Sequence, residues 1–68
     1  MPSEWRALNA VVELRRTAAD CVVLADALIY AESATDKAAA LRMLPRRIRA
    51  LQFRAARCLT ALDSEGIR

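Results

Sequence analysis

Arginines dominate one segment of this chain, and their spacing is the pattern most able to do chemistry. Between residues 42 and 57 stand six arginines and no acidic residue. Helix positions three and four apart lie on one side, so part of this set forms a stripe. We call this row the arginine stripe; it consists of Arg42, Arg46, Arg49, Phe53 and Arg57. Guanidinium groups in such a row bind carboxylates or phosphates.

Three interpretations of the arginine stripe compete. The favoured one is contact with an acidic surface of a partner protein, because arginine and aromatic side chains are enriched at interface hot spots. The second is a nucleic-acid contact, in which arginines bind phosphates and Phe53 stacks on an unpaired base. The third is a solvated face that keeps an alanine-rich bundle in solution. The single lysine and the net charge of only +3 argue against nucleic acid.

Catalytic chemistry is not expected from this sequence. The chain has no histidine, which removes the commonest general base and the commonest metal ligand. Its only glycine is Gly66, so there is no glycine-rich phosphate loop. Asp20, Asp26, Tyr30 and the two cysteines make no pair of nucleophile and base at a useful spacing. We therefore expect no enzyme activity, no metal site and no cofactor.

The two cysteines are expected to be small core residues. Cys21 and Cys58 both fall on apolar helix positions, where a thiol packs as a small hydrophobe. In an antiparallel hairpin they lie too far apart along the axis for a disulfide. The alternative is a bridge between the Cys21 residues of two copies.

Length and composition indicate one small all-α domain. The chain has 68 residues, of which 56% are apolar, with one glycine and three aromatic residues. The longest apolar stretch, residues 18 to 31, is too short for a membrane span and contains two aspartates. The N-terminal residues lack the basic and apolar regions of a signal peptide. We therefore expect no membrane contact and a cytoplasmic location.

Two helices of similar length are predicted, at about residues 4–31 and 36–63. Ser3 is the expected cap of the first helix, and Ser33 or Thr35 that of the second. Pro45 interrupts the second segment, which predicts either a kinked helix or two separate helices. The kink is favoured, because the apolar heptad pattern crosses the proline without a change of phase.

Charges on the two helices predict an antiparallel hairpin and its register. Asp20 would lie opposite Arg47, and Glu13 opposite Arg54, one heptad further along. The seam of the first helix then holds Ala7, Ala10, Leu14, Thr17, Cys21, Leu24, Leu28 and Ala31. The seam of the second helix holds Leu41, Leu44, Ile48, Leu51, Ala55, Cys58 and Leu62.

A second apolar face remains on the first helix, and a two-helix hairpin has nothing to cover it. The simplest solution is a homodimer that forms a four-helix bundle. The predicted dimer interface consists of Trp5, Leu8, Val12, Arg15, Ala19, Val22, Asp26 and Ile29. In an antiparallel arrangement Arg15 of one copy would pair with Asp26 of the other. The alternative is that both side chains simply extend into water.

This plan resembles that of the plasmid repressor-of-primer family, whose hairpins dimerise into four-helix bundles and bind paired RNA loops. The shared residues are short stretches, Ala7-Leu8-Asn9 and Cys58-Leu59. In that family the first helices build the RNA face, whereas the arginine stripe here lies on the second helix. The resemblance therefore concerns the architecture, and its function is not carried over.

The sequence thus predicts a small non-catalytic interaction protein that dimerises and binds a target protein with an acidic surface. Regulators or inhibitors of the kind that phages and plasmids encode fit this description. One alternative is a nucleic-acid-binding regulator that uses the arginine stripe. Another is a structural subunit whose apolar face docks into a larger helical assembly.

Overall fold

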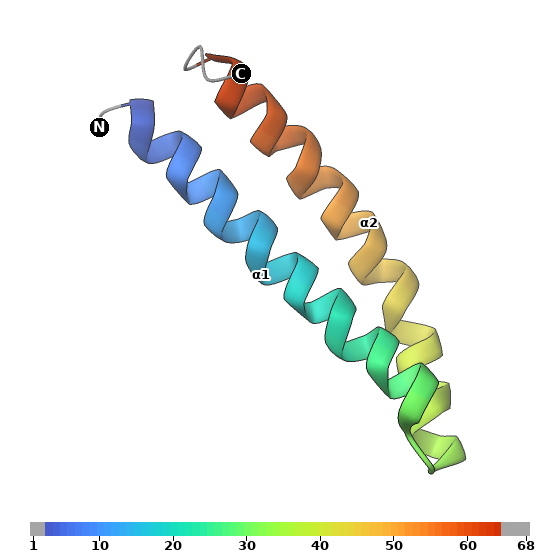
Figure 1. Cartoon of the computed structure of the whole chain (residues 1–68). Coiled ribbons are helices and arrows are strands. Elements are labelled where there is room, and N and C mark those ends of the chain that lie inside the picture. Colours follow the sequence, from blue (N-terminus) through green and yellow to red (C-terminus); the bar gives the residue numbers. More distant parts are fainter. Residues whose placement is uncertain (1–2, 65–68) are drawn as a thin grey trace.

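Two long antiparallel helices make up the computed structural model of this chain, which describes residues 3–64 (Figure 1). Helix α1 runs from Ser3 to Tyr30 and helix α2 from Ala34 to Ser64. A link of only three residues, 31–33, joins them. The predicted helical hairpin is therefore confirmed, with α2 beginning two residues earlier than expected.

Ser33 is the residue that starts α2. Its Oγ accepts hydrogen bonds from the backbone N–H groups of Thr35, at 3.2 Å, and Asp36, at 3.3 Å. These two donors have no partner within the helix, so the serine satisfies them as an N-cap. Asp36 adds a negative charge to the first turn, where it favours the helix dipole. Of the two predicted caps, Ser33 is the one used.

Helix α2 continues through Pro45 without interruption. The less favoured alternative, two separate helices, is therefore wrong, and the favoured single helix through Pro45 is confirmed. Proline lacks the N–H that would bond to the carbonyl of Leu41. Because Pro45 and Leu41 are both exposed, water can hydrate that carbonyl.

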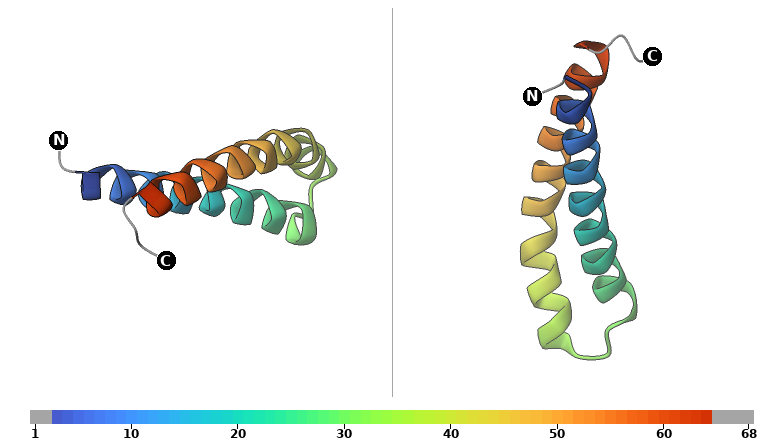
Figure 2. Two further views of the ribbon diagram at one scale, coloured as in Figure 1. Left: turned by 90° about the horizontal axis from the view of Figure 1, so that it is seen from above. Right: turned by 90° about the vertical axis from the view of Figure 1, so that its left-hand side faces the viewer.

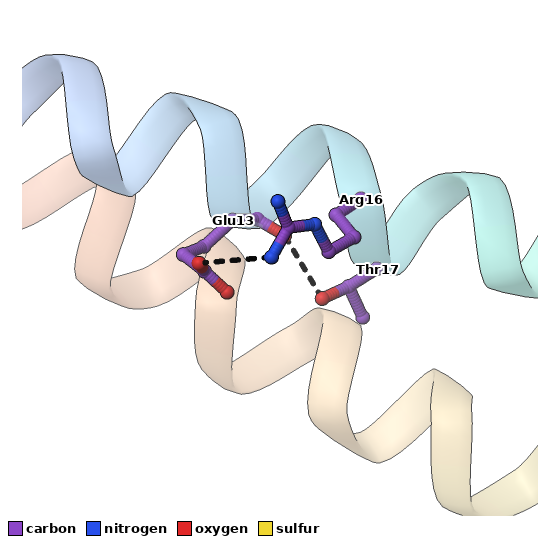
Figure 3. Close-up of polar contacts among 3 residues, drawn as sticks. All are labelled: Glu13, Arg16 and Thr17. Carbon is purple, nitrogen blue, oxygen red and sulfur yellow. Dashed lines mark hydrogen bonds and ion pairs between the residues drawn. The ribbon is translucent and has the colours of Figure 1, made fainter.

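Small side chains bring the helices together at three buried points. Ala40, near the turn, is 3% exposed, while Ala7 and Cys58, near the opposite end, are each 4% exposed. Thr17 is buried between these points, and its hydroxyl donates a hydrogen bond of 2.9 Å to the carbonyl of Glu13 (Figure 3). This bond satisfies the only polar group among the side chains buried most deeply in the described part of the chain.

The predicted seam of α1 is confirmed, because every one of its residues is buried or half-buried. The predicted seam of α2 is wrong in its first half. Leu41 is 63% exposed and Ile48 is also exposed, whereas Ala40 is buried. A straight helix drifts about 20° per heptad from a strict seven-residue repeat, which moves the contact line to the neighbouring position near the turn.

The predicted register is confirmed by one of its two ion pairs. Arg47 Nη1 of α2 lies 4.0 Å from Asp20 Oδ2 of α1. Glu13 instead pairs with Arg16 on its own helix, at 3.7 Å (Figure 3). The expected pair of Glu13 and Arg54 is therefore not formed.

The hairpin is long and thin, with extents of 47 × 20 × 14 Å. The first turn of α1 and the last turn of α2 lie at the same end, which we call the open end (Figure 2). Among the described residues, no large side chain is completely buried. The monomer therefore has a contact seam rather than a filled core.

Candidate interaction surfaces

The two sides of the hairpin differ in chemistry, and the register explains why. Successive helix residues differ by about 100°, so the residues before and after a seam position lie on opposite sides. Because the helices are antiparallel, the residues that follow seam positions lie on the same side of the hairpin in both helices. The residues that precede seam positions share the other side.

Apolar residues follow the seam positions. On α1, Leu8 follows buried Ala7, and on α2, Leu41 follows buried Ala40 and Leu59 follows buried Cys58. All three leucines are exposed. We call this side the apolar flank; its large members are Leu8, Val11, Val22, Ile29, Leu41, Ile48 and Leu59, every one exposed.

The predicted dimer interface overlaps this flank and extends beyond it. Leu8, Val22 and Ile29 lie on the apolar flank, with exposed Arg15 between them. The remaining predicted members are also exposed and lie further round on the outer face of α1: Trp5, Val12, Ala19 and Asp26. Leu41 and Ile48 of α2, which the sequence analysis places in the seam, are exposed and belong to the apolar flank.

Toward the open end charged residues precede the seam positions, whereas exposed Val23, Tyr30 and Met43 precede them nearer the turn. We call this side the polar flank after its charged part. Its charged members on α1 are Arg6, Glu13, Arg16 and Asp20. On α2, Arg54 and Arg57 precede seam positions, and Arg47 lies on the same side, where it pairs with Asp20. The ion pair of Asp20 and Arg47 lies here. Toward the open end this flank carries an excess of positive charge. Three arginines, Arg6, Arg54 and Arg57, lie there with one carboxylate, that of Glu13.

A groove of about 660 Å³ lies on the polar flank at the open end. Its size falls within the usual range for ligand sites, about 300–1,000 Å³. Residues of both helices line it, among them Arg6, Asn9 and Glu13 of α1 and Phe53, Arg54 and Arg57 of α2. We call it the open-end groove.

The arginine stripe divides into two parts. Phe53 and Arg57 line the open-end groove, and the Arg57 guanidinium lies 5.8 Å from the centre of the Phe53 ring. This cation–π contact holds the arginine against the aromatic face. Arg46 borders a shallow hollow with Met43 and Arg47. Arg42 and Arg49 are exposed on the outer face of α2.

Two arginines of the groove, Arg6 and Arg54, lie outside the predicted binding set. Arg6 lies on the other helix, and Arg54 was assigned to the ion pair with Glu13. The hairpin register, which places the start of α1 beside the end of α2, is the signal that points to Arg6.

The thiols are unequal. Cys58 is buried between the helices, as predicted, whereas Cys21 is half-buried. Within residues 3–64, no three side chains of metal-ligating type are grouped to hold an ion. The helices of this same region include none that is long and apolar enough to cross a membrane.

No protein-family model, no curated protein sequence and no solved structure matches this chain.

Proposed function

We propose that this chain is a non-catalytic interaction protein that assembles as a homodimer and modulates a target protein by binding it. Two hairpins pack through their apolar flanks into a four-helix bundle. The observation that carries the proposal is the row of exposed Leu, Val and Ile side chains along both helices of one flank.

The accessible surface of the single chain is larger than that of a compact monomer, which supports the proposed dimer. The chain has an accessible surface of 5386 Å². A compact monomer of its mass, 7.5 kDa, has about 4,200 Å². The excess is comparable to the roughly 800 Å² that each partner buries in a standard protein interface. Packing against a second copy removes this excess.

A second copy is the occupant that best matches the flank. The flank runs along both helices and its large members are branched aliphatic residues, as on the inner face of a four-helix bundle, with Arg15 and Gln52 between them. Burying one such side chain contributes about 1.5–3 kcal/mol. Because a two-fold interface presents the same patch twice, every contact between the two copies occurs twice.

Charges beside the flank favour an antiparallel match between the two α1 helices. Arg15 and Asp26 are both exposed and lie three helical turns apart, on nearly the same line. A two-fold axis near Cys21 brings Arg15 of each copy opposite Asp26 of the other. Two reciprocal ion pairs then specify the register of the dimer.

The polar flank supports the second half of the proposal. It faces away from the apolar flank, so dimerisation leaves its arginines accessible. Arginine and aromatic side chains on an accessible surface are typical of protein-binding hot spots. A small protein that dimerises through one flank and binds a target protein through the other can act as a regulator or inhibitor.

Sedimentation equilibrium tests the assembly, with two neighbouring valines as a matched pair. Val22 lies on the apolar flank and is 58% exposed, whereas Val23 precedes the seam residue Leu24, lies on the opposite side of the hairpin and is 65% exposed. We expect twice the monomer mass for the native chain and for Val23→Glu, and the monomer mass for Val22→Glu. A native chain that remains a folded monomer would contradict the proposal and favour a subunit of a larger assembly.

A further inference from the structure

The geometry points to the open-end groove as the target-binding site, and to an acidic peptide segment as its ligand. In this segment carboxylates lie on both sides of an apolar side chain. The inference rests on the proposed function in one respect, namely that the target is a protein. The proposed binding site is therefore the open-end groove, which residues of both helices line, and no longer the whole arginine stripe.

Charge is the first argument. Arg6, Arg54 and Arg57 line the groove from two helices, against a single carboxylate, that of Glu13. Glu13 is engaged by Arg16, whose Nη1 lies 3.7 Å from its Oε1. Arg54 is half-buried, whereas Arg42 and Arg49 on the outer face of α2 are exposed. An incoming carboxylate compensates this unbalanced charge and can accept two hydrogen bonds from one guanidinium.

The shape of the groove is the second argument. Ala10 and Ala61, both half-buried, belong to its lining, and their short side chains leave room between the helices. The Phe53 ring, over which Arg57 lies, forms part of the wall. An apolar side chain can occupy the space between the alanines while flanking carboxylates reach the arginines.

Glu13 decides between an acidic peptide and a nucleic acid. A phosphodiester strand carries one negative charge on every nucleotide, so some of them would lie beside the Glu13 carboxylate. A peptide can place a neutral residue at that point and its carboxylates elsewhere. The groove therefore favours a peptide.

Fluorescence polarisation with a labelled peptide tests the inference at low ionic strength. The probe carries a leucine between pairs of glutamates, and its control has glutamine at the same places. We expect the probe to bind and the control to bind at least about tenfold more weakly, because the control cannot form charge-assisted hydrogen bonds with the groove arginines. Equal binding of probe and control, or no binding of the probe, would overturn the inference.

Two double variants of equal charge separate the groove from general attraction. Arg54→Glu with Arg57→Glu changes the groove, whereas Arg42→Glu with Arg49→Glu changes only the outer face of α2. We expect the groove variant to lose at least about tenfold in affinity and the outer variant less than about threefold. Equal losses would show that the peptide follows net charge, which would overturn the site.

A third arm replaces the peptide by a labelled oligothymidylate of similar charge. Tighter binding of this strand, lost in the groove variant, would overturn the choice of a peptide. Sedimentation of the same proteins separates this inference from the proposed assembly. Peptide binding by a monomer would support the groove and refute the dimer, whereas a dimer without peptide binding would do the reverse.

Discussion

Asp20 and Arg47 face each other across the hairpin, with Asp20 Oδ2 4.0 Å from Arg47 Nη1. It is the ion pair between α1 and α2 within the described residues, and it lies near the middle of both helices. Each side chain is about half exposed, at 50% and 47%. The pair therefore marks the register of the helices more than it stabilises them.

A double-mutant cycle on this pair should give a small coupling energy. We expect Asp20→Asn, Arg47→Gln and the double variant to reveal about 0.2–1 kcal/mol, because exposed pairs are screened by water. Urea unfolding at one fixed protein concentration measures it, since the proposed dimer makes stability depend on concentration. A coupling above about 2 kcal/mol would contradict this account of the pair.

Replacing Pro45 should stabilise the protein. Pro45 lies inside α2 and is exposed, so Pro45→Ala restores a backbone hydrogen bond and removes no buried contact. We expect the free energy of unfolding to rise by about 1–3 kcal/mol, which thermal or urea unfolding measures. Ala38→Pro, inside the same helix and also exposed, should lower it by a similar amount. A loss of stability in Pro45→Ala would mean that the proline shapes the bundle.

Exchanging charges on Arg15 and Asp26 should test the register of the dimer. Arg15→Asp alone places like charges opposite each other in the antiparallel arrangement, as does Asp26→Arg alone. We expect each to weaken dimerisation by several-fold and the double exchange to restore it, measured by sedimentation. Single exchanges that leave the dimer unchanged would refute the ion pairs, with the side chains then simply extended into water.

The two thiols should react at different rates. Cys21 is half-buried and Cys58 is buried, so a thiol reagent reaches the first much sooner in the native protein. Mass spectrometry of the labelled peptides follows both, and in urea the difference should vanish. Equal rates in native buffer would contradict the burial of Cys58. A dimer band on a non-reducing gel, lost in Cys21→Ser, would reveal the intermolecular bridge.

The fold was largely predictable because charge and apolar spacing agree. The seam of α1 and the pairing of Asp20 with Arg47 both follow from a register counted along the chain. The seam of α2 near Leu41 was not predictable in the same way, since Ala40 and Leu41 are both apolar. Which of the two faces α1 depends on how far α2 drifts from a seven-residue repeat, and the packing of the two helices determines that drift.

The candidate site was less predictable than the fold. Phe53 and Arg57 follow from the stripe, but the groove also needs Arg6 from the other helix. Whether Glu13 pairs with Arg16 or Arg54 depends on the side-chain rotamers that these residues adopt. That choice determines whether Arg54 is neutralised or available, and no spacing in the sequence reveals it.

The short link between the helices gives the hairpin an order of closure. Contacts beside the three-residue turn close the smallest loops and lose the least chain entropy, so we expect the helices to pair first near Ala27 and Ala40. We expect the open end to pair last and to separate first. Amide hydrogens near Ala10 and Ala61 should therefore exchange faster than those near the turn. A peptide in the groove would contact both helices at the open end and hold them together. Its binding would therefore slow the exchange of the amide hydrogens near Ala10 and Ala61.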